Sequence, residues 1–141
     1  MIDFVVYAVD FDGTLTFNDY PKTGKPNWML IEFLKREREK GNKVILNTLR
    51  TGILLAAAVR WCLQHGLEFD AINDNLPEVI EEFGENPRKI AAHYHIDDRN
   101  AILSCVPGRR IEDEQLRDMH PSGSVPNKTR YKSGKRYISR R

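Results

Sequence analysis

The chain of 141 residues is long enough for one domain of ordinary size, which buries about two thirds of its unfolded surface. Apolar residues make up 40% of it and charged residues 30%, a composition that excludes a disordered or membrane-embedded protein. No apolar run approaches the ~20 residues that span a bilayer, and the N-terminus carries acids where a signal peptide carries basic residues. We therefore expect a cytoplasmic protein that makes no contact with a membrane.

Charge is distributed unevenly along the chain. The net charge is +2, but residues 121–141 contain seven Lys or Arg and no acid. Residues 1–120 hold the other 15 basic side chains and all 20 acids, a net charge of −5. The sequence thus predicts an acidic domain over residues 1–120 with a basic tail. Two readings of the tail remain open: a nucleic-acid-binding strip in which Tyr131 and Tyr137 stack on bases, or a tail that is solvated or docked on the acidic domain.

Short apolar segments alternate with amphipathic ones in chain order. Strands are expected over residues 4–9, 43–46, 69–72 and 90–96. Helices are expected from Asn27, as the N-cap, to Gly41, over residues 53–65, over residues 77–83 and, as a short polar helix, within residues 107–121. The runs FVVYAV and KVIL are apolar throughout, as in strands buried on both faces of a parallel sheet. This pattern predicts a three-layer, Rossmann-like α/β domain with a mainly parallel central sheet, whose ligand site lies beyond the carboxyl ends of the strands.

Acidic pairs follow the first and the last of these strands. Asp10 and Asp12 end the first strand, and Asp97 and Asp98 end the last. Carboxylates ~4 Å apart repel by about 4 kcal/mol at an effective dielectric of ~20, so the cluster requires a cation or protonation. Mg²⁺ suits a few carboxylates together with waters and a phosphate. The sequence therefore predicts a Mg²⁺ site.

These residue types are those of phosphoryl transfer through a carboxylate. Asp10 is the candidate nucleophile, and Asp12 is the candidate general acid and base for the leaving oxygen and the attacking water. Backbone amides around Gly13 and Thr14 are candidates for an anion-binding turn.

Two further side chains complete the predicted phosphate site. Thr48 ends the second strand and could donate a hydrogen bond to the phosphoryl oxygens, and Lys89 could supply a positive charge. Arg50 could bind a substrate phosphate or pair with an acid, and both readings stay open.

The order of these motifs resembles that of the haloacid dehalogenase (HAD) superfamily. The stretch DFDGTLT at residues 10–16 is similar to its first motif, VILNT ending in Thr48 to its second, Lys89 to its third, and HIDD ending in Asp98 to its fourth. Asn47 departs from the pattern, since the family usually has an apolar residue there. The resemblance covers about residues 4–104.

The resemblance implies a metal held by the Asp10 carboxylate, the backbone carbonyl of Asp12 and Asp97, with Asp98 in support. An acid at position 12 implies a phosphatase, acting on a phosphomonoester through an aspartyl phosphate. The gaps between the motifs leave no room for a large cap domain, which places the chain nearest the small capless HAD-like hydrolases. Water would then be excluded by the loop at residues 17–26, by another subunit or by a large substrate.

Other side chains near the strand ends have two readings each. Asn73 and Asn75 could bind substrate, although a turn role is favoured. His93 and His95 have a spacing also seen in metal sites, although packing is favoured. In the helices, Trp28 and Trp61 are expected in the core.

Two rival functions come from other classes. A signalling receiver domain uses similar residues, but there the phospho-accepting Asp stands mid-chain, which disfavours it here. A non-catalytic HAD-fold module that binds nucleic acid through the tail is the other alternative. Among enzymes, both a small phosphomonoester and a nucleic-acid end remain possible substrates, and the oligomeric state, including a homo-oligomer, stays open.

Overall fold

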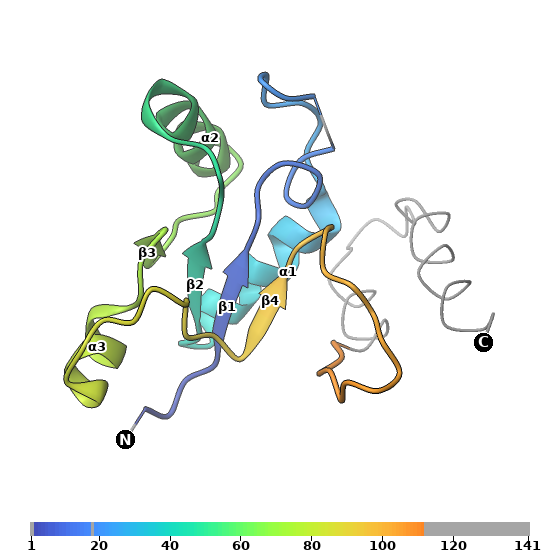
Figure 1. Cartoon of the computed structure of the whole chain (residues 1–141). Coiled ribbons are helices and arrows are strands. Elements are labelled where there is room, and N and C mark those ends of the chain that lie inside the picture. Colours follow the sequence, from blue (N-terminus) through green and yellow to red (C-terminus); the bar gives the residue numbers. More distant parts are fainter. Residues whose placement is uncertain (1, 18, 112–141) are drawn as a thin grey trace.

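The computed structural model describes residues 2–17 and 19–111 (Figure 1). The basic tail and most of the polar helix expected within residues 107–121 lie outside this range, and residues 107–111 form no helix. Within the described part of the chain, no helix has the length and apolar character needed to cross a membrane.

The core of the fold is a four-stranded parallel sheet. Its strands are β1 (Val6–Val9), β2 (Lys43–Leu46), β3 (Ala71–Ile72) and β4 (Tyr94–Ile96), in the spatial order β3-β2-β1-β4 (Figure 1). The helices that connect them are α1 (Trp28–Glu39), α2 (Gly52–Gln64) and α3 (Pro77–Phe83). The expected α/β fold with a mainly parallel sheet is confirmed. In the described residues, a loop and α1 separate β1 from β2, and α2, β3 and α3 lie between Thr48 and Lys89. This part of the chain therefore holds no large cap, as expected.

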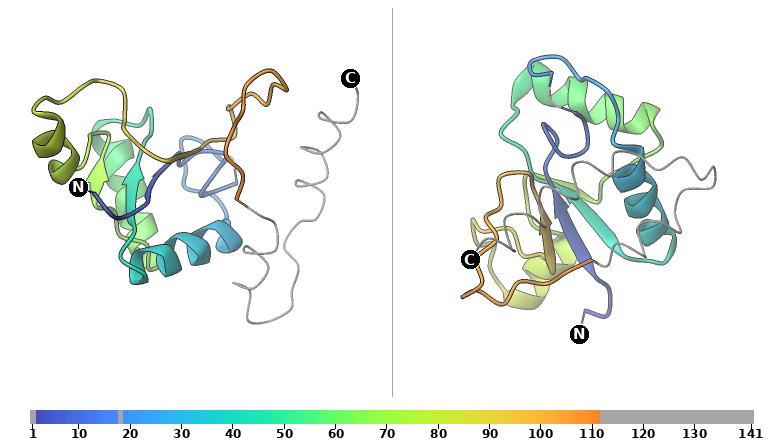
Figure 2. Two further views of the ribbon diagram at one scale, coloured as in Figure 1. Left: turned by 90° about the horizontal axis from the view of Figure 1, so that it is seen from below. Right: turned by 90° about the vertical axis from the view of Figure 1, so that its right-hand side faces the viewer.

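Helices cover both faces of the sheet and give three layers (Figure 2). On one face, α1 and α2 pack against Tyr7, Val9 and Leu46. On the other face, Val79 of α3 packs with Val6, Ala8 and Ile45. Alternate residues of β1 and β2 therefore enter two different cores, which explains why both strands are apolar throughout.

Three of the expected strands are shorter in the structure than in the sequence pattern. β1 begins at Val6 and not at residue 4, β3 holds only two residues, and β4 begins at Tyr94 and not at residue 90. At β4 the reason is local: the amide of Ala91 donates to the side chain of Asn75 (2.6 Å), so this part of the chain is held outside the ladder. The ladder resumes where the amide of His93 donates to Val6 O (2.9 Å).

Helix α1 begins where the sequence predicts. The side chain of Asn27 accepts from the amide of Leu30 (3.5 Å), which confirms the N-cap. The expectation for Trp28 is wrong, because this side chain is 43% exposed. As the first residue of α1, Trp28 projects beyond the edge of the core, and its ring lies 5.2 Å from that of His65. Trp61 is buried, as expected.

Candidate active site

Three carboxylates meet at the carboxyl ends of β1 and β4. Asp10 follows β1, and its amide donates to Ile96 O (2.9 Å), which aligns the ends of the two neighbouring strands. Asp97 and Asp98 follow β4 directly. One carboxylate oxygen of each lies within 4.8 Å of the others, so the structure assembles Asp10, Asp97 and Asp98. The sequence placed the Asp12 carboxylate in the same cluster, and the structure does not include it there. We call these residues the three-acid group.

The hydroxyl of Thr14 joins two members of this group. It accepts from the amide of Asp98 (3.1 Å) and donates to Oδ2 of Asp10 (3.5 Å), and the residue is buried. The amide of Thr14 instead donates to Phe11 O (3.2 Å). The expected anion-binding role of this amide is therefore not supported, since the amide already has an acceptor inside the turn. Thr14 acts on the acids through its side chain.

Gly13 is needed at its position for two reasons. Its φ of +76° lies in the left-handed region, which side chains rarely adopt. A Cβ added there would also stand 2.3 Å from Oδ2 of Asp98. The glycine thus lets Asp98 approach the turn after β1, a contact that the sequence motif does not reveal.

The environment of Asp10 disfavours the ionised form of its carboxyl group. Burial and, after it, the charge of Asp97 raise its pKa to about 6, and the charges of Asp98 and Asp12 act in the same direction. The backbone hydrogen bond from Phe11 acts in the opposite direction. A cation placed among the acids would relieve this repulsion and favour the ionised Asp10 that a nucleophile requires.

Asp12 lies apart from the three-acid group and pairs with Arg50. Nε and Nη2 of Arg50 donate to Oδ2 and Oδ1 of Asp12, both at 2.8 Å. The Arg50 side chain is 1% exposed and that of Asp12 23% exposed. Of the two readings left open for Arg50, the structure shows pairing with an acid.

The guanidinium of Arg50 also organises its surroundings. It stacks between the rings of Phe11 (4.8 Å) and Tyr20 (5.3 Å), and it donates to Lys22 O (2.6 Å) and Leu54 O (3.4 Å). Tyr20 and Lys22 belong to the loop expected to exclude water. Arg50 therefore ties this loop to both Asp12 and the first turn of α2.

Thr48 is fixed at the end of β2 by its backbone and its hydroxyl. Its amide donates to Oδ1 of Asn73 (2.7 Å), and its hydroxyl accepts from the amide of Arg50 (3.1 Å). An accepting hydroxyl retains its own hydrogen for another acceptor. Thr48 thus keeps the hydrogen-bond donor that the sequence analysis assigned to it.

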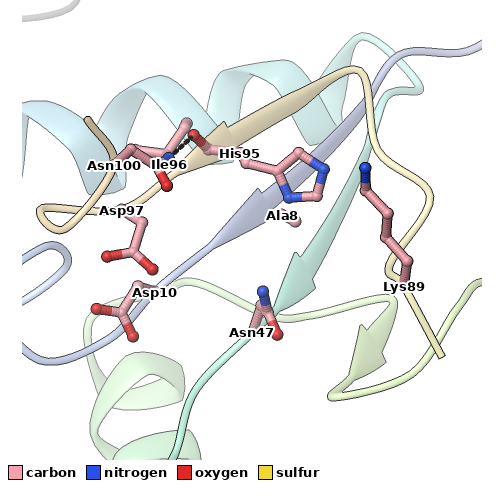
Figure 3. Close-up of a pocket in the computed structure, with 8 residues that line it drawn as sticks. All are labelled: Ala8, Asp10, Asn47, Lys89, His95, Ile96, Asp97 and Asn100. Atoms are coloured by element: carbon pink, nitrogen blue, oxygen red, sulfur yellow. Dashed lines mark hydrogen bonds between the residues drawn. The ribbon is translucent and has the colours of Figure 1, made fainter. Parts of the chain in front are cut away.

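A pocket of about 160 Å³ lies beside the acids (Figure 3). It is lined by Ala8, which belongs to the sheet face that packs against Val79 of α3. A cavity of this size accommodates a group as large as benzene. Asp10 and Asp97 stand at one end of the pocket, and Lys89 stands at the other (Figure 3). The remaining lining residues are Asn47, His95, Ile96 and Asn100. The structure thus brings Lys89 to the pocket of Asp10, whereas Asp12 and Thr48 do not line it.

Sequence reasoning missed the polar lining of this pocket. Asn47 was seen only as a departure from a motif, yet it follows Ile45 on the same sheet face and reaches the pocket next to Asp10. Period-two alternation along β2 could have found it. Asn100 donates to His95 O (2.7 Å) and had no sequence signal.

The two histidines differ from their favoured reading. His93 and His95 are both exposed, so neither is a core packing residue. The ring of His93 accepts from the amide of Val6 (2.9 Å), and neither residue joins the three-acid group. Although the residue as a whole is exposed, partial desolvation of the ring, followed by the nearby charge of Lys89, lowers the pKa of His95.

The residues present suit a hard divalent cation. All three side chains of the group offer carboxylate oxygens, the ligands that Mg²⁺ prefers, and three converging carboxylates leave negative charge in need of neutralisation. Asp10 and Asp97 would hold such an ion, with Asp98 beside them.

A solved structure of a conserved protein from Bacteroides thetaiotaomicron is 40% identical to this chain, with a TM-score of 0.61. The match covers 70% of this chain and 78% of that protein. The chain belongs to the same family as that protein. No protein-family model and no curated protein matches the chain. The Bacteroides protein is described only as conserved, so membership of its family supports the fold and assigns no reaction.

Proposed function

We propose that the chain is a Mg²⁺-dependent phosphohydrolase of the HAD type, which cleaves a phosphomonoester in the cytoplasm through an aspartyl phosphate on Asp10. The observation that carries the proposal is the three-acid group, whose oxygens converge within 4.8 Å at the ends of two adjacent parallel strands. A bound Mg²⁺ would neutralise charge on the acids and on the phosphoryl oxygens.

The chain's own residues would divide the reaction between them. Asp10 attacks phosphorus, and the bond to the leaving oxygen breaks while Asp12 donates a proton to that oxygen. Water then attacks the phosphorus of the aspartyl phosphate while Asp12 takes its proton, and the bond to the Asp10 oxygen breaks, which releases phosphate and restores the carboxylate. Thr48 donates a hydrogen bond and Lys89 supplies positive charge to the phosphoryl oxygens.

The pairing of Asp12 with Arg50 adds a condition to this scheme. Both oxygens of Asp12 accept from Arg50 in the structure, so one of them must leave Arg50, take up a proton and turn toward the leaving group before proton transfer. Arg50 would remain in place through its bonds to Lys22 O and Leu54 O. Arg50 is thus a positioning residue in the proposal and not a ligand for substrate phosphate.

Phosphate release from a panel of phosphomonoesters tests the proposal. The panel includes small sugar and nucleoside phosphates and the phosphorylated ends of DNA and RNA, each with Mg²⁺ and with EDTA. Wild type should release phosphate only with Mg²⁺, and Asp10→Asn should reduce the rate by at least about 10³-fold. Asp3→Asn, which removes an exposed acid before β1, is the matched control and should keep the activity.

Failure has a defined form in this experiment. If wild type hydrolyses none of these substrates with Mg²⁺ or Mn²⁺, the phosphohydrolase proposal is wrong. Binding of nucleic acid by such an inactive protein would instead favour the non-catalytic binding module.

A further inference from the structure

The loop that follows β3 carries three consecutive polar residues, Asn73, Asp74 and Asn75. Substrate contact was one reading of the two asparagines, but their side-chain hydrogen bonds point elsewhere. Asn73 binds the segment that carries Thr48, and Asn75 binds the segment that carries Lys89. In the proposed function, Thr48 and Lys89 are the residues that act on the phosphoryl oxygens.

Asn73 holds Thr48 through a single short bond. Its Oδ1 accepts from the amide of Thr48 (2.7 Å), while its own amide donates to Leu46 O (2.7 Å). Its φ is +50°, the left-handed conformation that asparagine tolerates better than most residues. Backbone and side chain of Asn73 thus both bind the end of β2, and they fix where Thr48 leaves the strand.

The buried side chain of Asn75 is hydrogen-bonded to the segment at residues 86–91. The residue is only 2% exposed, and its Nδ2 donates to Oδ1 of Asn86 (3.0 Å), Pro87 O (2.8 Å) and Lys89 O (3.3 Å). Its Oδ1 accepts from the amide of Ala91 (2.6 Å). The segment forms neither helix nor strand. The Asn75 amide therefore replaces the hydrogen bonds that regular structure would supply around Lys89.

Asp74 stiffens the connection between the two asparagines. Its Oδ1 accepts from the amide of Asn75 (2.8 Å) and from Nδ2 of Asn86 (2.9 Å). The loop after β3 is thus bonded to the end of β2 on one side and to the Lys89 segment on the other.

We propose that Asn73 and Asn75 are positioning residues: Asn73 fixes the place of Thr48, and Asn75 fixes that of Lys89, the two groups that act on the phosphoryl oxygens in the proposed function. The inference rests on the proposed function and deepens it. Misplacing a catalytic group by about 1 Å can cost on the order of 10²-fold in rate, which makes such anchors consequential.

Four single variants and their combinations test the inference. Asn73→Gly keeps the left-handed backbone but removes the acceptor for Thr48, and it should lower kcat/KM about tenfold. Asn73→Asp restores an acceptor and should recover most of that loss. Asn75→Asp removes the donors to the Lys89 segment and should cost about 10²-fold. Asn42→Asp is the matched control, because Asn42 anchors Val5 at the opposite end of the sheet.

Pair-specific coupling separates positioning from general destabilisation. In a Lys89→Met background, adding Asn75→Asp should lower kcat/KM by less than about twofold, whereas adding Asn73→Gly should lower it by its full factor. In a Thr48→Ala background the pattern should reverse. Equal effects of both asparagine variants in both backgrounds would overturn the inference, since a purely structural role has no preferred partner.

A measurement without turnover keeps the inference distinct from the proposed function. Lysines carrying ¹³C-methyl groups give separate NMR signals, and that of Lys89 is assigned by its loss in Lys89→Met. The Lys89 signal should move in Asn75→Asp and stay in place in Asn73→Gly and Asn42→Asp. If Asn75→Asp does not fold, Asn86→Ala removes one partner of Asn75 from an exposed position and should move the signal less in the same direction. An unmoved Lys89 signal would refute the role of Asn75, whether or not the protein hydrolyses phosphate.

Discussion

Arg50 donates two parallel hydrogen bonds of 2.8 Å to the carboxylate of Asp12, and the Arg50 side chain is almost completely buried. Bidentate pairs of this kind combine charge with fixed geometry, which a single ammonium group cannot reproduce. The pair connects the residue two positions after the proposed nucleophile to the loop containing Lys22 and to α2. Substitutions at this pair should therefore affect both stability and reaction.

We expect Arg50→Lys to lower the free energy of unfolding by about 2 kcal/mol. A lysine cannot make both hydrogen bonds to Asp12, and its ammonium group does not replace the planar guanidinium against the Phe11 and Tyr20 rings. Urea denaturation measures the change. Arg38→Lys is the control, since Arg38 also grips a carboxylate with two bonds (Asp70, 3.1 and 3.2 Å) but is 29% exposed. Equal losses for the two variants would contradict a special role for the buried pair.

We expect Gly13→Ala to cost more than its conformation alone explains. The left-handed φ should cost about 1–2 kcal/mol, and the new Cβ must also displace the Asp98 carboxylate, which lies 2.3 Å away. Gly41→Ala isolates the first effect, because Gly41 has a φ of +94° and nothing within 4 Å of an added Cβ. The difference in unfolding free energy between the two variants should be about 0.5–1 kcal/mol, the usual cost of forcing a side chain away from its rotamer. Equal losses would show that Asp98 moves aside freely.

Asp10→Asn should stabilise the metal-free protein near neutral pH. The pKa of Asp10 is raised from its usual 3.8 to about 6 in the folded chain, chiefly by burial and then by Asp97. The stability provided by protonated Asp10 is thus complete below about pH 3.8 and is lost as the pH rises through about 6. Solvent screening of this half-buried group reduces the gain expected for the variant at pH 7.5 to about 1 kcal/mol.

Urea denaturation in EDTA at pH 4.5 and pH 7.5 checks this pH dependence. The advantage of Asp10→Asn should be present at pH 7.5 and shrink at pH 4.5. Asp3→Asn, which removes an exposed acid, should give no such difference. A variant that is less stable than wild type at pH 7.5 would show that Asp10 is not under repulsion.

Added Mg²⁺ should raise the melting temperature of the wild type, because an ion that binds only the folded state stabilises it by about 2.7 kcal/mol at 100 times its Kd. Asp97→Asn removes one member of the three-acid group and should abolish most of the shift. Glu82→Gln, at an exposed position on α3, should keep it. Thermal unfolding with and without Mg²⁺ is the measurement, and a full shift in Asp97→Asn would place the ion elsewhere.

The sequence alone determined the layers of the fold and the three-acid group. The apolar runs in β1 and β2 are typical of strands buried on both faces, as in a parallel sheet between two helical layers. Acids that end parallel strands meet at one edge once those strands are neighbours, so Asp10, Asp97 and Asp98 could be assigned from their places in the pattern, although the same pattern also included Asp12. Local signals such as the Asn27 cap were equally readable, because they depend on residues only a few positions apart.

Only the tertiary structure decided which partner each polar side chain takes. Arg50 and Asp12 are 38 residues apart, and nothing local chooses between an acid and a substrate phosphate for a guanidinium. The segment around Lys89 has no strand partner, and its backbone groups bind the buried side chain of Asn75 instead. The same hydrogen bonds make β4 shorter than the sequence pattern predicts. Trp28 is exposed although it lies at an apolar position of α1. In each case the outcome depends on distant chain segments competing for the same hydrogen bonds or the same buried volume, and a linear pattern does not contain that competition.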